Sequence, residues 1–300
     1  MTEPHHATDP ASRMPVFKHT LIETSRICIA CEERAGSAPP LVFIHPNRTS
    51  NRVWDFVVRA SRLPNRMLLP SLRGHGDSDW PETGYRLEDH RDDMVGFIEA
   101  VCSEPVILVG QATGATLALM VASVRPERVL AVVAAQPAIG IPGAVNTLVR
   151  DQVLAQSRLP DRAAARAALP FSERWRTEVV EHTLDHMLAA HPDGGFSWRY
   201  HGPGVCDTEA ELMRELHADI HWTGPALVFA GACSTVLPPE MAVQVAARLP
   251  GAQLRSLPDA NHRLSQDNPE GFAALLDQFV STFNGPQAGL TSMGARPSLR

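Results

Sequence analysis

The sequence predicts an α/β protein with a mostly parallel, doubly wound sheet and a helical cap inserted into it. Short apolar segments rich in Val, Ile and Leu alternate with helical segments over residues 41–135 and again over 226–283. This alternation is typical of βαβ units around a parallel sheet. Between these regions, residues 141–222 hold only helical pieces interrupted by Pro and Gly, with no convincing strand. An insertion of this kind is expected to form a cap over an active site.

Each element is expected from its local hydrophobic pattern. The first two strands predict an antiparallel edge hairpin, and the later strands are short apolar runs. The helix over 87–101 is amphipathic, with Leu87, Met94 and Ile98 on its apolar face. The predicted strands are 17–22, 26–31, 41–44, 67–70, 106–109, 128–133, 226–230 and 253–257, and the predicted helices are 51–63, 87–101, the segment after Gly114, 239–248 and 269–283.

Domain boundaries follow from where this pattern begins, breaks and resumes. We expect a core formed by residues 16–140 and 223–283, with residues 141–222 as the cap. The polar, Pro-containing segment 1–15 is expected to be disordered, and so is the segment 284–300, which contains Gly, Pro and Ser throughout.

Composition and charge narrow the class of protein. The 300 residues are 44% hydrophobic and carry a formal net charge of −6, so we expect neither a nucleic-acid partner nor a membrane surface. No apolar run reaches the roughly 18 residues needed to cross a bilayer. The first residues lack the basic and apolar regions of a signal peptide. The 5 cysteines have no framework spacing, which predicts reduced thiols in a cytoplasmic protein.

The corner over residues 106–120 carries the main functional signal. Four apolar residues lead into Gly110-Gln-Ala-Thr-Gly114, and helical sequence follows. The two glycines permit a tight turn and close helix–sheet packing. This strand–turn–helix resembles the nucleophile elbow of the α/β-hydrolase family, Gly-x-Ser-x-Gly. Ala112 fills the nucleophile's position, and alanine has no oxygen with which to attack a carbonyl or accept an acyl group.

Four further motifs resemble the same family and occur in its order. They are His45-Pro-Asn47, Leu72-Arg-Gly-His-Gly-Asp-Ser78, Gly231-Ala-Cys-Ser234 at the position of the acid, and Ala260-Asn-His262 at the position of the catalytic histidine. The resemblance covers residues 20–283 and implies a fold like that of capped esterases, dehalogenases and C–C hydrolases. Residues 45–54 are also similar to a haloalkane dehalogenase loop, but that chemistry needs an Asp in place of Ala112.

Carried over by position, the resemblance implies a degenerate triad. His262 is the base, whereas Ser234 stands at the acid position and Gln136 at the alternative acid position that some relatives use. Either neutral side chain could orient the histidine by a hydrogen bond, but neither supplies the charge that stabilises its cation. We therefore expect His262 to be less basic than in a complete triad and suited to shuttling a modestly acidic proton.

The resemblance also implies an oxyanion hole that is still present. Its donors would be the backbone N–H groups of Thr113 and Asn47. Pro46 has no N–H group, but it precedes the second donor and does not remove it. The residues expected around the substrate pocket are His45, Pro46, Gln111 and Trp54.

Two other features of the sequence could carry chemistry. Cys233 or Ser234 could face His262 as a substitute nucleophile, although the oxyanion hole is directed at position 112. In the cap, the i, i+4 pairs His182/His186 and His217/His221 each place two imidazoles on one helical face, and two facing pairs could bind zinc or iron. No carboxylate-bearing motif accompanies these pairs, so no metal is expected.

The surviving residues are compatible with three functions. The first is a non-hydrolytic enzyme, of the cyclase, lyase, decarboxylase or isomerase type, that acts on a small carbonyl-containing substrate without a cofactor. Thr113 and Asn47 would stabilise an enolate or oxyanion, and His262 would move a proton. The second is a non-catalytic binding protein on the same scaffold. The third is an esterase or C–C hydrolase in which Ala112 has replaced the serine.

Overall fold

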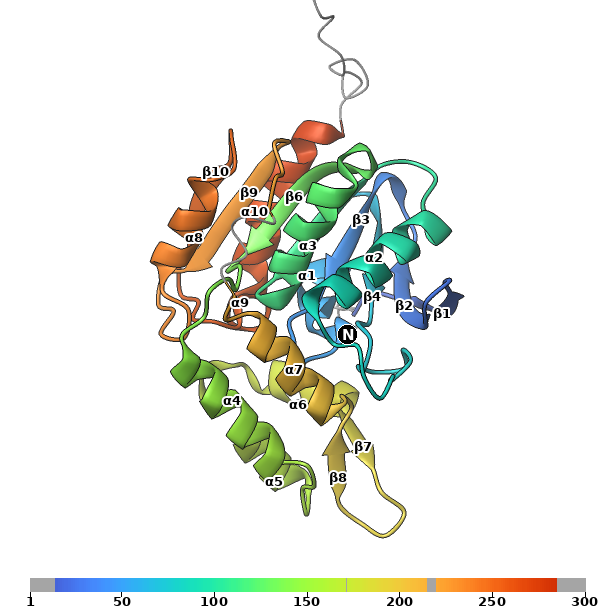
Figure 1. Cartoon of the computed structure of the whole chain (residues 1–300), viewed down its shortest axis with the longest axis vertical. Coiled ribbons are helices and arrows are strands. Elements are labelled where there is room, and N and C mark those ends of the chain that lie inside the picture. Colours follow the sequence, from blue (N-terminus) through green and yellow to red (C-terminus); the bar gives the residue numbers. More distant parts are fainter. Residues whose placement is uncertain (1–13, 171, 215–219, 285–300) are drawn as a thin grey trace, which may run out of the picture.

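A central sheet of eight strands organises the structure (Figure 1). The computed structural model describes residues 14–170, 172–214 and 220–284. The strand order is β1-β2-β4-β3-β5-β6-β9-β10. β2 pairs antiparallel with β1 and with β4, and the remaining pairs are parallel, which confirms the predicted edge hairpin and mostly parallel sheet. The strands are β1 (Lys18–Glu23), β2 (Cys28–Arg34), β3 (Ser37–Ile44), β4 (Asn65–Pro70), β5 (Val106–Gln111), β6 (Val129–Ala135), β9 (Ala226–Gly231) and β10 (Gln253–Leu257).

The inner strands are buried on both faces, which explains their continuous apolar sequence. In β3, Val42 and Ile44 point into one hydrophobic cluster, while Leu41 and Phe43 point into the cluster on the opposite face. Such alternation is the ordinary two-residue period of a strand. Because both faces need apolar side chains, no polar residue interrupts the run from Leu41 to Ile44.

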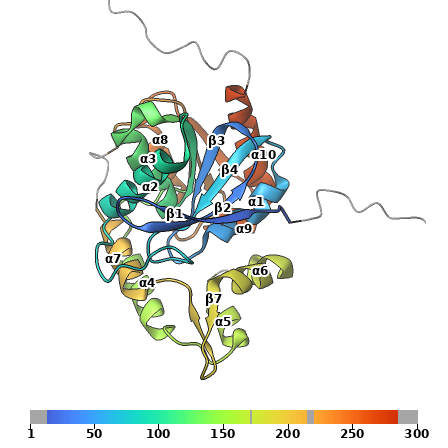
Figure 2. The same ribbon diagram turned by 90° about the vertical axis from the view of Figure 1, so that its right-hand side faces the viewer.

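Helices cover both faces of the sheet (Figures 1 and 2). Helices α2 (Leu87–Val101), α3 (Thr113–Val124) and α8 (Pro239–Ala246) pack on one face, and α1 (Asp55–Ala60) and α10 (Pro269–Val280) pack on the other. The helix predicted over 51–63 is shorter than expected, because it begins as the 3-10 turn η2 (Asn51–Trp54) and ends at Ala60. Ser61 is extended there, and its hydroxyl donates a hydrogen bond of 2.6 Å to Asp277 in α10. The remaining short helices of the core are η3 (Pro126–Arg128), α9 (Leu264–Asp267) and η6 (Ser281–Phe283).

The segment between β6 and β9 lies below the sheet as a separate layer (Figures 1 and 2). Its elements are α4 (Gly143–Ala155), α5 (Arg162–Ala168), η4 (Ser172–Arg174), α6 (Thr177–Met187), β7 (Leu188–Ala190), β8 (Phe196–Trp198) and α7 (Gly202–Glu211). The sequence predicted no strand in this segment, but β7 and β8 form an antiparallel hairpin. Each strand has only three residues, too few to display a two-residue period, and Gly194 and Gly195 make the turn between them with positive φ.

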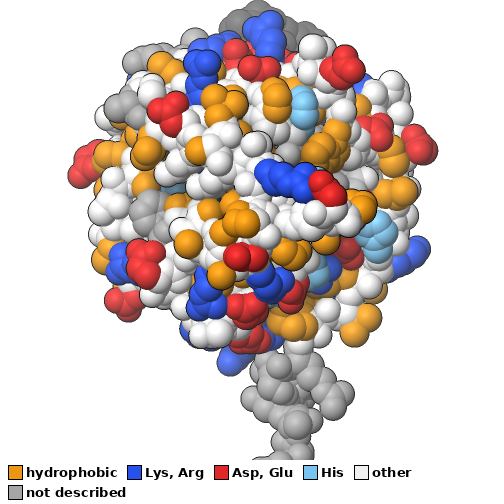
Figure 3. Space-filling view, turned by 90° about the horizontal axis from the view of Figure 1, so that it is seen from below, with side chains coloured by type: hydrophobic (Ala, Val, Ile, Leu, Met, Phe, Trp, Pro, Cys, Tyr) orange, Lys and Arg blue, Asp and Glu red, His pale blue; other side chains and the backbone are white. Residues whose placement is uncertain are grey.

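The outer face of this layer carries basic and acidic side chains next to one another rather than one continuous patch of either sign (Figure 3). Ion pairs between α5 and α6 contribute to this pattern, with Arg162 2.8 Å from Glu181 and 2.7 Å from Asp185. None of the helices in the described ranges is long and apolar enough to span a membrane.

The close approach of α3 to the sheet depends on two glycines. A Cβ placed on Gly114 would overlap the backbone carbonyl of Ile44 at the end of β3, and one placed on Gly110 would overlap the backbone of Gly114. These neighbours are backbone atoms, so no side-chain rotation can make room. The two glycines therefore bring the first turn of α3 into direct contact with β3 and β5.

We expect Gly114→Ala to lower the free energy of unfolding by about 2 kcal/mol or more, because overpacking against backbone forces the helix away from the sheet. The matched control is Gly96→Ala in α2, where the nearest atom would be the Thr24 Cβ at 3.7 Å. That change should be neutral or stabilising by up to about 1 kcal/mol. Urea unfolding of both variants measures the difference, and equal midpoints would contradict this account of the packing.

A pair of buried histidines supports the loop that follows β3. The His45 and His75 rings lie 5.1 Å apart between centroids. Leu72 N–H donates to His45 Nε2 over 3.0 Å, so the proton of this ring is on Nδ1, which lies 2.8 Å from the Pro46 carbonyl. His75 Nδ1 donates to the Arg73 carbonyl over 2.9 Å. Burial lowers the pKa of His75 to about 4, and burial together with His75 lowers the pKa of His45 to about 3.

These depressed pKa values predict a loss of stability in acid. The unfolded chain takes up a proton at His75 near pH 6.5, whereas the folded chain does so only near pH 4. Stability is therefore complete above about pH 6.5 and falls by about 1.4 kcal/mol per pH unit per histidine between these values. His75→Gln should reduce the slope of unfolding free energy against pH by one proton. Urea unfolding at several pH values measures this slope, and an equal slope in the variant and the unmodified chain would contradict this account.

Candidate active site

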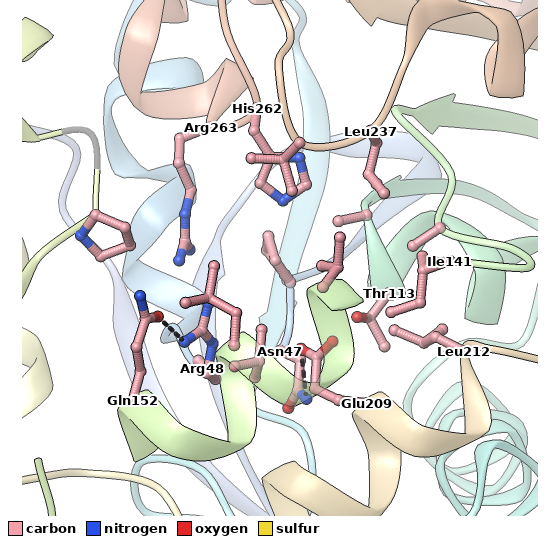
Figure 4. Close-up of a pocket in the computed structure, with 18 residues that line it drawn as sticks. Asn47, Arg48, Thr113, Ile141, Gln152, Glu209, Leu212, Leu237, His262 and Arg263 are labelled. Atoms are coloured by element: carbon pink, nitrogen blue, oxygen red, sulfur yellow. Dashed lines mark hydrogen bonds between the residues drawn. The ribbon is translucent and has the colours of Figure 1, made fainter. Parts of the chain in front are cut away.

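One cavity lies where the carboxyl ends of the central strands meet the cap (Figure 4). Its volume is about 110 Å³. The core contributes five segments to its wall: residues 46–48 after β3, residues 112–113 at the start of α3, residue 138 after β6, residues 236–237 after β9, and residues 262–263 before α9. The cap contributes a mostly apolar side, with Ile141, Val145, Leu148, Val149, Gln152, Glu209 and Leu212.

Ala112 occupies the turn between β5 and α3. Its φ of 50° and ψ of −118° are unusual for a residue with a Cβ and are of the kind that costs about 1–3 kcal/mol. The turn is held by a hydrogen bond of 2.9 Å from Ala112 N–H to the Ala135 carbonyl, and Ala115 N–H donates to the Ala112 carbonyl over 3.0 Å. The backbone thus has the sharp reversal of a nucleophile elbow, while the side chain at the cavity is a methyl group.

Two backbone N–H groups border the cavity next to this methyl. Thr113 is the first residue of α3, so its N–H has no acceptor within the helix. Neither this group nor the Asn47 N–H donates a hydrogen bond to another residue of the described chain. The Asn47 side chain is engaged elsewhere, since its Nδ2 donates to the Val205 carbonyl and to Glu209 Oε1, each over 3.1 Å.

The His262 ring faces the same cavity (Figure 4). Its Nδ1 is shielded from solvent and has no hydrogen-bond partner among the described residues. Burial, followed by the nearby charges of Arg263 and Arg48, lowers the pKa of His262 to about 3. The ring is therefore neutral at pH 7.

The residues at the two acid positions bond to each other instead of to His262. Gln136 Nε2 donates to Ser234 Oγ over 2.9 Å and to the Leu237 carbonyl over 2.6 Å, and Gly231 N–H donates to Gln136 Oε1 over 3.0 Å. Ser234 Oγ also donates to the Leu237 carbonyl. This neutral brace joins the ends of β6 and β9, and it corrects the expectation that either side chain orients His262. Cys233 is exposed, and neither it nor Ser234 lines the cavity, so the structure does not bring a substitute nucleophile to His262.

Three of the four residues expected around the substrate pocket do not line the cavity. Trp54 packs edge-on against Phe43 and Phe272, with 5.4 Å between the ring centroids in each pair. Its side chain is therefore part of the hydrophobic core. His45 supports the loop after β3, as described above. Gln111 Oε1 accepts from Ser265 N–H over 3.0 Å and thereby holds the loop that carries His262. Of this set, Pro46 lines the cavity.

Three charged residues that the sequence analysis did not select also line the cavity: Arg48, Arg263 and Glu209. Arg263 is 7% exposed, and burial and Arg48 lower its pKa to about 10. Glu209 is 8% exposed, and burial raises its pKa. Each arginine directly follows a motif residue, Asn47 or His262, which is the signal that could have identified it. Glu209 lies in the cap, where no motif marks it.

A carboxylate connects the cap to the histidine loop. Asp267 Oδ1 accepts a hydrogen bond of 2.9 Å from Trp175 Nε1 in the cap, and its Oδ2 accepts one of 2.8 Å from the Asn261 N–H. Trp175 is itself part of the cap's hydrophobic cluster. The loop that presents His262 and Arg263 is thus fastened to the cap as well as to the core.

The histidine pair of α6 faces the core. His182 Nε2 lies 3.0 Å from Asp55 Oδ2, and the ligand atoms of Asp55, His182 and His186 fall within 4.8 Å of one another. Two imidazoles and a carboxylate are a ligand set that suits zinc or iron. Arg52 lies 2.6 Å from the same Asp55 oxygen, however, and already neutralises this carboxylate. The second pair includes His217, which lies outside the described residues, so the expected facing of two pairs is not tested.

Comparisons with known proteins agree with this geometry. The family model described as alpha/beta hydrolase fold matches residues 39–269. Lipase LipV of Mycobacterium tuberculosis is 28% identical over 81% of this chain and 95% of its own length, and the sn-1-specific diacylglycerol lipase ABHD11 of Mus musculus is 25% identical over 82% of each. The crystal structure of E-2-(acetamidomethylene)succinate hydrolase superposes with a TM-score of 0.81 and 25% identity over 89% of this chain and 100% of that one. The chain belongs to the α/β-hydrolase fold family.

Proposed function

We propose that this chain is a non-hydrolytic enzyme that acts on a small carbonyl compound without forming an acyl-enzyme. The observation that carries this proposal is the convergence of three groups on one cavity: the methyl of Ala112, the unpartnered ring of His262, and the free backbone N–H groups of Asn47 and Thr113. Stabilisation of an enolate or oxyanion, combined with a proton transfer, suits cyclisation, decarboxylation, C–C lysis or isomerisation.

The backbone of the elbow supports a retained role for the oxyanion hole. In this family the donors are the N–H of the residue after the nucleophile and an N–H from the loop after the third strand of the fold. Here these are Thr113 and Asn47, and both N–H groups are without an acceptor in the described chain. A carbonyl oxygen placed between them would receive two hydrogen bonds that strengthen as negative charge develops.

The lack of an acid partner limits what His262 does. Burial and the charges of Arg263 and Arg48 lower the pKa of His262 to about 3, and the ring has no carboxylate beside it among the described residues to offset them, so its imidazolium form is costly. A serine alcohol would be a poor proton source for such a base. A proton that leaves a carbon next to a carbonyl is more acidic once the oxyanion is stabilised, and His262 can pass it on within the same cavity. No cofactor takes part in this proposal, and the free cysteines support a cytoplasmic location.

A second candidate is a binding protein that uses the same cavity without chemistry. The neutral Gln136–Ser234 brace favours it, since nothing in that brace polarises His262. The third candidate, an esterase or C–C hydrolase whose serine has been replaced by Ala112, is disfavoured by the same brace. Replacement of one serine would leave the acid in place, whereas here both acid positions are neutral.

We expect the chain to turn over a compound from a panel of β-dicarbonyl and polyketide-like substrates, and His262→Ala to reduce kcat by about 10²–10⁴, the usual contribution of a general acid–base residue. The control is His221→Ala, which changes an exposed histidine that does not line the cavity and should retain full activity. Steady-state kinetics measure both. Turnover that is unchanged in His262→Ala would exclude the proton-transfer role.

A serine at position 112 tests the alternatives. We expect Ala112→Ser to hydrolyse aryl esters poorly, because His262 has no carboxylate partner in the described chain and the acid of a triad is worth up to about 10⁴ in kcat. Aryl-ester release is the measurement. Efficient hydrolysis by this variant, with no turnover of any panel compound by the unmodified chain, would favour a disabled hydrolase. Inactivity of all variants on the whole panel would favour the binding protein.

A further inference from the structure

We propose that the substrate carries a carboxylate, which binds between the guanidinium groups of Arg48 and Arg263 while its carbonyl group faces Ala112. This proposal rests on the proposed function for the place of the carbonyl, but the carboxylate site itself is inferred from the arginines alone. The two side chains enter the cavity from different loops, Arg48 after β3 and Arg263 before α9. In Figure 4 they extend toward each other from opposite sides of the cavity.

Arg263 is a buried cation without a hydrogen-bonded partner for its guanidinium among the described residues. It is 7% exposed, its Nε is shielded from solvent, and its guanidinium donates no hydrogen bond to a described residue. A guanidinium has several N–H donors and no way to become neutral near pH 7. Burial of such a group without an anion costs several kcal/mol. An anionic ligand would remove that cost, because it supplies both the charge and the acceptors.

Arg48 adds a second positive charge at the same place. Its side chain makes one hydrogen bond, from Nη1 to Gln152 Oε1 over 3.2 Å, and its backbone has a φ of 56°, which is uncommon for a residue with a side chain. No ion pair joins Arg48 to an acidic group in the described ranges. The two guanidinium groups repel each other, and Arg48 contributes to the lowered pKa of Arg263.

The nearby carboxylates Glu209 and Asp267 attract Arg263 through their charge, but in the described ranges neither forms a hydrogen bond or an ion pair with Arg263 or Arg48. Glu209 lines the same cavity, but its Oε1 accepts from Asn47 Nδ2, and it forms no ion pair with either arginine. Asp267 is engaged by Trp175 and by the Asn261 N–H. The cavity therefore holds two cations against one engaged carboxylate, and a ligand carboxylate balances the charge. The planar fork of a guanidinium matches a carboxylate in a bidentate arrangement.

A carboxylate bound there would also act on His262. Arg263 and Arg48 are the two charges that disfavour protonation of this ring. A negative charge between them offsets their field, so protonation of His262 costs less when the substrate is bound than in the free protein. The ligand would then supply the negative charge that Ser234 and Gln136 lack. We therefore expect the enzyme to bind a neutral analogue of the substrate more weakly and to turn it over with a lower kcat.

The first test uses binding of simple ligands and does not depend on turnover. The probes are 4-oxopentanoate, its neutral methyl ester, and inorganic phosphate, measured by calorimetry with the full chain. We expect 4-oxopentanoate to bind and its ester to bind at least about tenfold more weakly, since hydrogen bonds to charged groups are the stronger class. Equal binding of acid and ester would overturn the proposal, and tighter binding of phosphate would overturn the assignment to a carboxylate.

The variants Arg263→Gln and Arg48→Gln should each weaken 4-oxopentanoate binding about tenfold or more. Arg263→Lys keeps the positive charge but not the planar set of N–H donors, so it should weaken binding less than Arg263→Gln does. The control is Arg248→Gln, at an exposed position near the end of α8, which should bind as the unmodified chain does. Unchanged affinity in both cavity variants would overturn the proposal.

A stability measurement separates a ligand site from a structural arginine. Without ligand, Arg263→Met should raise Tm by a few degrees, because it removes an uncompensated buried charge. With saturating 4-oxopentanoate the unmodified chain should have the higher Tm of the two, since only this chain is stabilised by binding. A lower Tm of Arg263→Met without ligand would assign Arg263 a structural role and overturn the proposal. Binding in these tests with no turnover in any assay would leave the carboxylate site standing and reject the proposed reaction.

Discussion

The contact between the first turn of α3 and the end of β3 determines where every group of the site lies. Gly114 allows this helix to reach the backbone carbonyl of Ile44, and Gly110 allows the chain to reverse within the turn. One residue after Ile44 the chain enters the loop that holds Asn47, and Thr113 opens the helix on the other side of the same contact. Asn47 and Thr113 therefore reach the same cavity from the two sides of a contact between backbones.

Electrostatics around the cavity depart from those of a complete triad. A triad places a carboxylate behind its histidine, so that the ring can carry a positive charge during the reaction. Here the residues at the two acid positions, Gln136 and Ser234, are neutral and bond to each other, and the charges that act on His262 are the positive ones of Arg263 and Arg48. The cap side of the cavity, formed largely by α4, is mostly apolar, and charges act more strongly in such surroundings than in water. The proposed anion site and the lowered pKa of His262 both follow from these positive charges.

The fold could be predicted from the sequence because each inner strand is an apolar run and each helix has one apolar face. The motif positions then placed Asn47, Ala112, Thr113 and His262 on the loops that the structure brings to one cavity. Trp54 and Gln111 could not be placed in this way. Both lie on elements next to the site, and sequence spacing does not tell whether a side chain points to the cavity or to the core.

The cap was the least predictable part, because its short elements have no sequence pattern that shows where their side chains point. The three-residue strands β7 and β8 are too short to show a period, and Glu209 approaches the site through tertiary packing of α7, with no local pattern. Arg48 and Arg263 adjoin motif residues, but adjacency in sequence does not reveal burial. That neither forms an ion pair with a described residue is a property of the three-dimensional arrangement alone.

The carboxylate of Asp267 gives the cap a mechanical role. One of its oxygens is held by Trp175 in the cap and the other by the backbone of the loop that ends in His262 and Arg263. If the cap moved to admit a ligand, Trp175 would leave Asp267 and the loop would lose one restraint. In the proposed reaction, entry of the ligand and positioning of His262 would then be two aspects of a single motion.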